Sequence, residues 1–451
     1  MRKTFGIGLL AVCLVFAGLG FAVQAKTYDF EGRTVRIVTH DMTKDGLWGD
    51  PASRAHFEEV ERRFNAKIEI VAMHYDDGSI IEDLQQGLLA GTADGVYYVK
   101  VGEAYQYANE GFFAPLTDLD IEPGLFEQYI DPELLTYRGE KYFFSPTTAN
   151  VTQLATRGRA QQPDFEGIIW NKTKFEELGL PNLYELVENG EWTWDKFKEI
   201  AVAATRDTDG DGETDLWGYA PYASPWGFPR AHNWLITNGA DVTRVDEDGR
   251  VVFALDEPAA LEALNFYQEL ELLGVVYTDQ PGYQAIVNDK VVMAICRPWT
   301  LYIIEDFEDD LGYVPIPKGP RMDEYVAPSV SGGLYAMAIP ATTKEDPAAL
   351  VALAQALHYD SREYLDFDSV DMLYEDSWGM IVRDYESLQW LIHGVMNTKI
   401  LKYEVPEFIG TDFFNTWNEY NVRILEGESP ASVVASFKDA AQAKLDEMFN
   451  Q

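Results

Sequence analysis

The chain has 451 residues, with 35 Lys and Arg against 75 Asp and Glu, a formal net charge of −40 at pH 7 and 47% hydrophobic residues. At on the order of 150 residues per domain, this length predicts two or three compact units with ample apolar material, and it excludes a single small module. A surface this acidic repels nucleic-acid phosphates and anionic lipid headgroups, so the composition argues against both as partners.

The first 25 residues have the features of an export signal. Arg2 and Lys3 precede an apolar run from Phe5 to Val23, and small residues lead up to a cleavage position after Ala25. A retained membrane anchor is one alternative, because the run approaches the ~20 residues that span a bilayer. Acylation at Cys13 is another. The glycine content and the small residues at the end favour cleavage, so we predict a signal peptide over residues 1–25.

Removal of that signal has two consequences for the mature protein. It leaves 451 − 25 = 426 residues and only one of the two cysteines, Cys296, so no intramolecular disulfide can form. No second apolar run of spanning length follows residue 25. We therefore expect a periplasmic or otherwise extracytoplasmic protein that relies on its hydrophobic core for stability.

Strand-like and helix-like segments alternate along the mature chain. Short β-branched runs predict strands at 35–39 and 68–72, and a helix between them is indicated by apolar residues at helical spacing, namely Phe57, Val60 and Phe64. Later helices are expected to open at Pro258 and at Pro347. Strands separated by helices are typical of βαβ units, so the sequence predicts an α/β fold with mostly parallel sheets.

Motifs of known catalytic sites are absent from the sequence. The six histidines include no pair at the i, i+4 spacing of a helical metal site, and there is no HExxH, GxSxG or GxxxxGK[ST]. Carboxylates are so abundant that any fold would bring some pairs within glycosidase distance, roughly 5 to 10 Å. The acid content therefore does not indicate a hydrolase, and we predict no catalytic residues and no catalytic cofactor.

One acidic segment has the spacing of a calcium-binding loop. Loop positions 1, 3, 5 and 9 carry carboxylates, position 6 is Gly212, and the carbonyl of the residue at position 7 would add a further oxygen. Position 12, however, is Gly218 instead of glutamate, so water or a distant residue would have to complete the shell. A solvated Asp/Gly turn is the alternative. We predict a structural Ca²⁺ held by Asp207, Asp209, Asp211, Glu213 and Asp215.

Aromatic residues concentrate between positions 192 and 234. Trp194 follows a threonine at the start of a predicted helix, which favours a place in the core. Trp226 lies in a segment rich in proline and glycine, where few large rings can be buried locally. Trp226 can therefore either form part of a binding surface or pack within its own loop, and the sequence does not decide between the two.

Taken in order, eight short segments resemble the family 1 extracellular solute-binding proteins, the carbohydrate-binding components of ABC importers. Each segment is weak evidence alone, but their order and spacing cover nearly all of the mature chain. They are AGTAD at 90–94, GFFAPL at 111–116, IWNK at 169–172, EWTWD at 191–195, DKVVMA at 289–294, VPIPKGP at 314–320, SGGLYAMAIP at 331–340 and LEGESPA at 425–431.

This resemblance implies the type II periplasmic-binding-protein fold, in which two Rossmann-like lobes are joined by crossing strands and the ligand lies in the cleft between them. By family placement the crossings fall near 143–169 and 328–331. Each lobe is then discontinuous. Lobe 1 comprises 26–147 and 329–378, and lobe 2 comprises 148–328 and 379–451.

The resemblance also implies a function. The protein would capture an extracytoplasmic sugar or oligosaccharide and deliver it to the transmembrane subunits of an ABC permease, as a monomer and without catalysis. A secreted polysaccharide-acting enzyme with paired carboxylates is the alternative. Presentation of the ligand to a membrane sensor shares the same fold and is not distinguished by the sequence.

A sugar site needs aromatic platforms for the C–H face of a pyranose and planar hydrogen-bonding groups for its rim. Trp299 is the first candidate platform, since it follows the apolar run at 291–296 where related proteins place a cleft tryptophan. The alternative is a tryptophan that plugs the end of a strand. Trp226 and Trp234 are further candidate platforms. The candidate rim partners, chosen for charge and loop context, are Asp41, Arg230, Asn233 and Arg297.

Overall fold

The structure is a computed structural model of the whole chain. It describes residues 27–40, 51–74, 79–100, 104, 107–120, 135–144, 165–222, 231–248, 250–297, 300–301, 304, 307–329, 335–357, 386–387, 401–403 and 419–449. The predicted signal peptide lies outside these residues. Within them, no helix combines the length and the apolar character that crossing a membrane requires.

The first sheet has five strands in the order β2-β1-β3-β14-β6. β1 pairs in parallel with β2 and β3, whereas β14 runs antiparallel to β3 and β6. The strands are β1 (Thr34–His40), β2 (Lys67–Met73), β3 (Val96–Lys100), β6 (Phe143–Phe144) and β14 (Tyr335–Ala338). β14 comes from a part of the chain far from the others, so this sheet is completed by a return of the chain.

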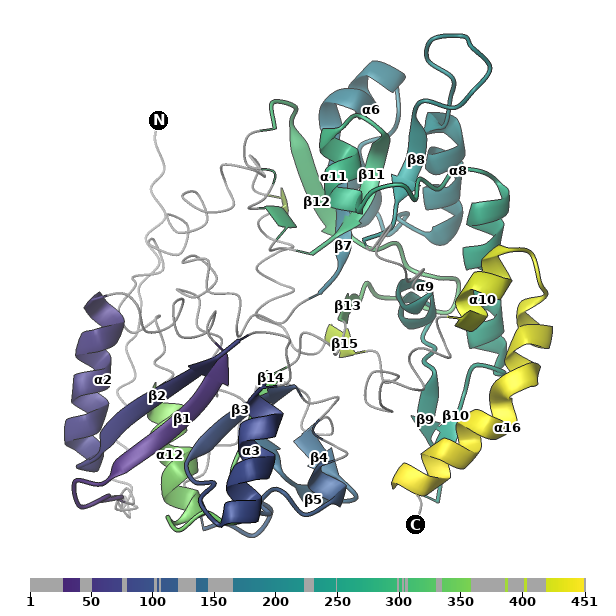
Figure 1. The fold of residues 1–451 in the computed structure, drawn as a ribbon. Coiled ribbons are helices and arrows are strands. Elements are labelled where there is room, and N and C mark those ends of the chain that lie inside the picture. Colours follow the sequence, from purple (N-terminus) through teal and green to yellow (C-terminus); the bar gives the residue numbers. More distant parts are fainter. Residues whose placement is uncertain are drawn as a thin grey trace, which may run out of the picture.

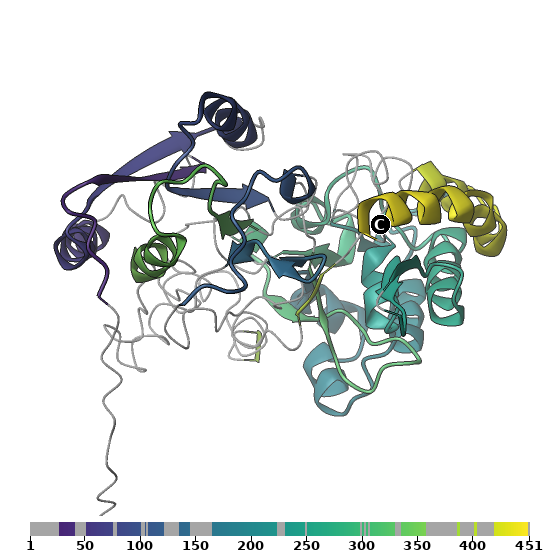
Figure 2. The same cartoon turned by 90° about the horizontal axis from the view of Figure 1, so that it is seen from below.

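Helices cover both faces of the first sheet. α3 (Ser79–Ala90) lies on one face, and α2 (Pro51–Phe64) and α12 (Pro347–Leu357) lie on the other (Figure 2). Successive strand residues point to opposite faces, so Val38 packs with the side of α3 while Ile37 packs with α2 and α12. The helix indicated by Phe57, Val60 and Phe64 is confirmed as α2, and the helix expected to open at Pro347 is confirmed as α12.

The second sheet has four strands in the order β12-β7-β11-β8. β11 is parallel to β8 and antiparallel to β7, and β12 is antiparallel to β7. The strands are β7 (Gly167–Asn171), β8 (Trp217–Ala220), β11 (Val291–Cys296) and β12 (Leu311–Pro315). Figure 1 shows this sheet above and to the right of the first.

The second sheet carries most of the remaining described helices. α16 packs along α10 and a two-stranded ribbon, and is seen in yellow at the right of Figure 1. The helix that Pro258 was expected to open is confirmed as α10. The elements are α6 (Lys172–Leu178), α7 (Leu183–Glu188), α8 (Trp194–Ala204), α9 (His232–Thr237), α10 (Pro258–Leu272), α11 (Gly282–Val287), α16 (Pro430–Phe449), β9 (Thr243–Val245) and β10 (Val251–Phe253).

The expectation of mostly parallel sheets is wrong, because each of the two sheets just described is mixed. The chain passes from β6 in the first sheet to β7 in the second, and it returns from β12 to β14. A strand that arrives from the other sheet begins at the edge nearest that sheet. It is therefore antiparallel to neighbouring strands that end at the same edge, as β7 is to β11 and β14 is to β3. The local sequence of β7 or β14 carries no sign of this direction.

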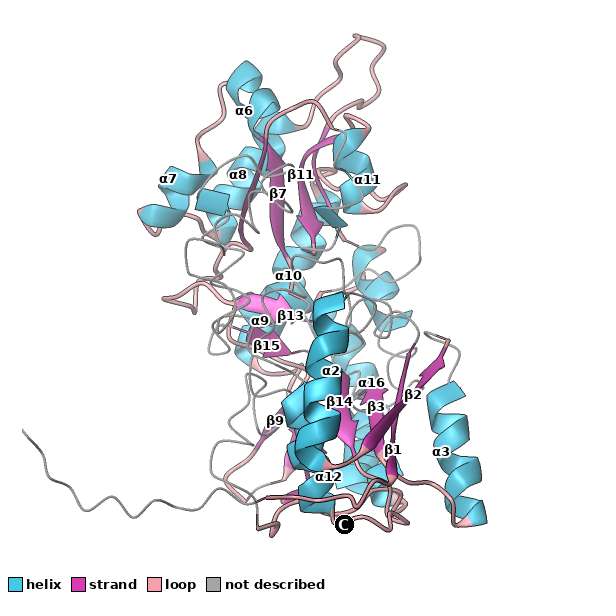
Figure 3. Cartoon of the chain, turned by 90° about the vertical axis from the view of Figure 1, so that its left-hand side faces the viewer, coloured by secondary structure: helices cyan, strands magenta, loops and turns pink. Residues whose placement is uncertain are grey.

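The described parts of the two passages between the sheets form hydrogen bonds. β13 (Ala327–Ser329) pairs in parallel with β15 (Leu401–Tyr403), and both lie between the sheets (Figure 3). The backbone N–H of Glu166, just before β7, donates to the carbonyl oxygen of Pro328 in β13 at 2.7 Å. Directly before β6 in the chain, β4 (Thr136–Tyr137) and β5 (Glu140–Lys141) form a short hairpin. The lobe boundaries predicted above stay predictions.

Candidate functional site

The edge of the second sheet that faces the passages gathers three polar side chains. The parallel strands β8 and β11 both end at this edge, and they are followed closely by Tyr222 and directly by Arg297. β7 runs the other way, so its first residue, Gly167, lies opposite Cys296, and Glu166 immediately precedes it. The carboxyl ends of parallel strands are the usual position of ligand sites in α/β sheets. This edge is therefore the candidate site.

Glu166 is the centre of a buried polar network. Its side chain is 0% exposed. Its Oε1 lies 3.1 Å from Arg297 Nε, and its Oε2 accepts a hydrogen bond from Asn233 Nδ2 at 2.7 Å. The Nε2 of His232 lies 3.1 Å from the same Oε2. His232 and Asn233 open α9, Arg297 follows β11, and Glu166 itself precedes β7. The start of one helix and the ends of two strands therefore meet at this carboxylate.

The surroundings keep Glu166 ionised. Burial by itself would raise the pKa of its carboxyl group, because a charge is poorly solvated inside a protein. The neighbouring His232, Arg297 and Asn233 outweigh that effect and hold the pKa of Glu166 well below its ordinary value of 4.5. The site therefore holds a fixed negative charge, and its donors are oriented toward it.

Arg297 is held from two sides. Its guanidinium carbon lies 4.2 Å from the centre of the Tyr222 ring, and its Nε faces Glu166. The side chain is 11% exposed, so it lies at the margin of the buried network. A guanidinium is a planar donor fork that stacks well on aromatic rings. This pair can present hydrogen-bond donors beside an apolar ring face.

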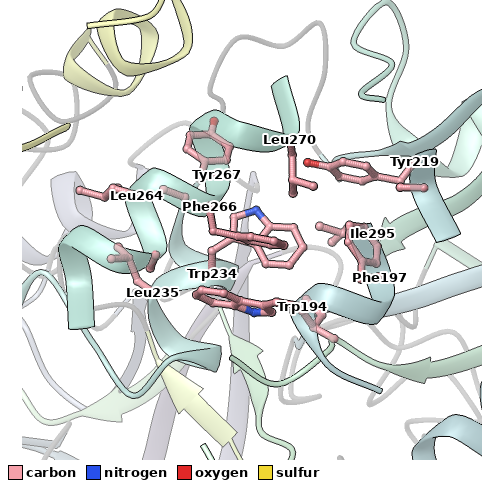
Figure 4. Packing of buried hydrophobic residues seen from close by; sticks show 14 of the residues in the cluster. Trp194, Phe197, Tyr219, Trp234, Leu235, Leu264, Phe266, Tyr267, Leu270 and Ile295 are labelled. Carbon is pink, nitrogen blue, oxygen red and sulfur yellow. The ribbon is translucent and has the colours of Figure 1, made fainter. Parts of the chain in front are cut away.

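Trp234 does not lie on a binding surface, and its prediction as a sugar platform is wrong. The side chain is 1% exposed, and its ring is surrounded by those of Trp194, Phe197, Tyr219 and Phe266 at centroid distances of 5.1 to 6.3 Å (Figure 4). No ring face remains for a pyranose. Trp234 instead anchors α9, the helix that carries His232 and Asn233 to Glu166.

Trp194 lies in the core, as predicted. The Thr193 hydroxyl caps α8 by accepting a hydrogen bond from the N–H of Lys196 at 3.4 Å. The Trp194 ring stacks on Phe266 at 4.5 Å with an interplanar angle of 10°, and its Nε1 donates to Thr237 Oγ1 at 3.2 Å.

Of the other predicted ligand contacts, Asn233 and Arg297 are brought together on Glu166. Four fall outside the described residues and stay predictions: Trp299, Trp226, Asp41 and Arg230. In the sequence they adjoin described elements, since Asp41 follows β1, Arg230 precedes α9 and Trp299 follows Arg297 by two positions.

Sequence reasoning missed Glu166, His232 and Tyr222. Glu166 had one available signal, because it is a single acid between Phe165 and the apolar strand that begins at Gly167. A charge embedded in an apolar run is buried only with partners. His232 was considered only for metal-binding spacing, and Tyr222 only as one aromatic residue among many.

The acidic loop lies between α8 and β8 and brings three of its five predicted ligands together. Carboxylate oxygens of Asp207, Asp209 and Asp215 lie within 4.8 Å of one another. Asp211 and Glu213 are not in this group; Asp211 Oδ1 instead accepts the N–H of Glu213 at 2.8 Å. The oxygen set suits a hard cation such as Ca²⁺, which is bound by carboxylates and carbonyls.

Backbone hydrogen bonds shape the acidic loop. Asp207 accepts the N–H groups of Gly210 at 2.6 Å and Gly212 at 2.8 Å, and these bonds lower the pKa of its carboxyl group. Gly212 at position 6 adopts φ +96°, a backbone conformation that glycine allows in a tight turn. Gly218 at position 12 lies in β8, where a Cβ atom would be 2.4 Å from the carbonyl oxygen of Ala201. Position 12 therefore cannot hold glutamate or any other residue with a side chain.

The Glu166 network predicts a specific loss of stability in acid. A carboxyl whose folded pKa lies below its unfolded value of 4.5 contributes stability above pH 4.5, and that contribution is lost as the pH falls toward the folded pKa. The difference in free energy of unfolding between wild type and Glu166→Gln should be largest above pH 5 and should shrink as the pH falls below 4.5. Urea unfolding from pH 7 to pH 3 measures it. A difference that stays constant over this range contradicts the assignment.

Two sheets with flanking helices, hydrogen-bonded passages between them and a polar and aromatic cluster at the facing edge define a two-lobed binding protein. The chain belongs to the bacterial extracellular solute-binding protein family, whose profile matches residues 50–357. Among curated protein sequences, none matches significantly.

Solved structures share the fold at low sequence identity. An ABC substrate-binding protein from Listeria monocytogenes in complex with cycloalternan is 14% identical, with a TM-score of 0.58 over 92% of this chain and 98% of its own. The GacH receptor of Streptomyces glaucescens, solved unliganded and with acarbose, is 18% identical, with a TM-score of 0.58 over 92% and 99%. UgpB from Mycobacterium tuberculosis, in complex with glycerophosphocholine, is 15% identical, with a TM-score of 0.56 over 92% and 98%.

These comparisons confirm the family resemblance and the predicted fold class. The protein has the type II periplasmic-binding-protein fold, with two α/β lobes and passages between them. It is a solute-binding protein of an exported family that works with ABC transporters.

Proposed function

We propose that this protein captures a sugar or oligosaccharide between its two lobes and delivers it to the transmembrane subunits of an ABC permease. The observation that carries the proposal lies at the sheet edge that faces the passages, where the buried Glu166 holds Arg297 and Asn233 and the Tyr222 ring stacks on Arg297. The saccharides bound by the Listeria and Streptomyces proteins support the same ligand class.

The chemistry of the set fits a pyranose. Arg297 and Asn233 supply planar polar groups for ring hydroxyls, and Trp299 and Trp226 are the proposed platforms for the C–H face. Asp41 and Arg230 complete the proposed rim. The net charge of −40 disfavours a strongly anionic ligand, so we propose a neutral saccharide.

The direct test is to identify what the protein binds. Mass spectrometry of material released from the purified protein should find a saccharide, and calorimetry should measure its stoichiometric binding. Where nothing co-purifies, calorimetry uses a panel of neutral saccharides that includes acarbose and cycloalternan. A protein that carries and binds no saccharide contradicts the proposal. The same sample separates receptor from enzyme, because a receptor leaves the bound oligosaccharide intact after long incubation.

We propose that the mature protein starts at Lys26 and acts as a monomer in the periplasm. The family is exported, which supports removal of residues 1–25 as a signal peptide. N-terminal sequencing of secreted protein tests the cleavage position. A mature product that retains residues 1–25 would show an anchor, and an acyl group on Cys13 would show a lipoprotein.

We also propose that the acidic loop binds Ca²⁺ as a structural ion. Binding to the folded state alone should stabilise the protein by about 2.7 kcal/mol when the ion is at a hundred times its dissociation constant. Added Ca²⁺ should raise the melting temperature and EDTA should reverse the rise, whereas Asp209→Ala should abolish both responses. If neither Ca²⁺ nor EDTA changes the melting temperature of the wild type, the loop is only a turn.

A further inference from the structure

Glu166 links three separate parts of the molecule. Its backbone N–H donates to Pro328 in the passage strand β13 at 2.7 Å, while its carboxylate lies 3.1 Å from Arg297 Nε and accepts Asn233 Nδ2 at 2.7 Å. The carboxylate is fully buried and does not face solvent. Both of its carboxylate oxygens have protein partners, so Glu166 is placed to orient Arg297 and Asn233.

An ionised carboxylate can only accept hydrogen bonds, and this determines which way Asn233 is turned. Its Nδ2 faces Glu166, so its Oδ1 is left as an acceptor. Asn233 is 3% exposed, and no donor among the described residues contacts that Oδ1. A buried acceptor without a donor is unfavourable, and a bound ligand is one group that can supply the donor. The orphaned oxygen thus indicates a place for a ligand hydroxyl.

We propose that Glu166 is the positioning residue of the ligand site, holding Arg297 in place and turning Asn233 so that its Oδ1 accepts a hydroxyl group of the bound saccharide. This inference rests on the proposed function. It adds a requirement for the ligand, which must place a hydrogen-bond donor at Asn233. An analogue that is deoxygenated or O-methylated at that position should bind more weakly.

The test is a double-mutant cycle on saccharide affinity, measured by calorimetry with the panel member that binds wild type most tightly. Glu166→Gln replaces hydrogen bonds to a charged group by weaker bonds to a neutral one. We therefore expect it to weaken saccharide binding about 10- to 100-fold. Asn233→Leu should weaken binding about tenfold in wild type but less than threefold in the Glu166→Gln background, because Asn233 has already lost its orientation. Glu166→Asp keeps the charge and should recover part of the affinity.

Glu262 provides a matched control. It accepts hydrogen bonds from Asn238 Nδ2 at 3.0 Å and Arg321 Nε at 2.7 Å, the same donor types, but on α10 and with 40% of its side chain exposed. Glu262→Gln should leave the dissociation constant unchanged. A folded Glu166→Gln with wild-type affinity, or purely additive effects with Asn233→Leu, overturns the positioning role and leaves the proposed function standing.

Two further outcomes complete the test. If Glu166→Gln does not fold, Asn233→Leu in the wild-type background decides, and wild-type affinity in a folded Asn233→Leu variant overturns the inference. A wild-type protein that binds no saccharide overturns the proposed function and this inference together.

Discussion

Replacing Trp234 with alanine should lower the free energy of unfolding by about 3–5 kcal/mol, the range for removing a large aromatic side chain from a packed core. The ring is 1% exposed and is enclosed by four other aromatic rings, so the surrounding structure cannot easily collapse into the space. Urea unfolding followed by circular dichroism measures the effect.

Leu89→Ala is the control for the Trp234 prediction. Leu89 is 92% exposed, so truncating it should change stability little. A Trp234→Ala variant as stable as wild type would mean that the ring is not part of the core. Because α9 also carries Asn233, we expect any folded Trp234→Ala protein to bind saccharide more weakly as well.

Replacing Trp299 with alanine should have the opposite pattern, with a wild-type melting temperature and at least tenfold weaker saccharide binding. Loss of a stacked aromatic ring costs a few kcal/mol, and about 1.4 kcal/mol corresponds to a factor of ten in affinity. Calorimetry with the identified saccharide measures the dissociation constant, and thermal unfolding measures the stability.

Trp299→Phe is the matched control, since it keeps a flat ring and should retain much of the affinity. An unchanged dissociation constant in a folded Trp299→Ala variant would show that another ring forms the platform, and Trp226→Ala would then be the next variant. If Trp299→Ala mainly loses stability, the tryptophan plugs the end of a strand.

Local physical chemistry in the sequence determined much of the secondary structure. Proline at the first turn opens α10 and α12, threonine caps α8, and Gly212 adopts the positive φ that the acidic turn requires. These features depend on neighbours within a few residues. They could therefore be predicted without knowing the fold.

Only the tertiary structure decided which distant residues meet. Asn233 lies 67 positions from Glu166 in the sequence, and Arg297 lies 131 positions away. Their contact depends on the strand order β12-β7-β11-β8 and on the reversed direction of β7, which follow from the passage between the lobes. The same reason explains Trp234, because whether a tryptophan packs in the core or faces a ligand depends on the elements around it, and no local pattern records them.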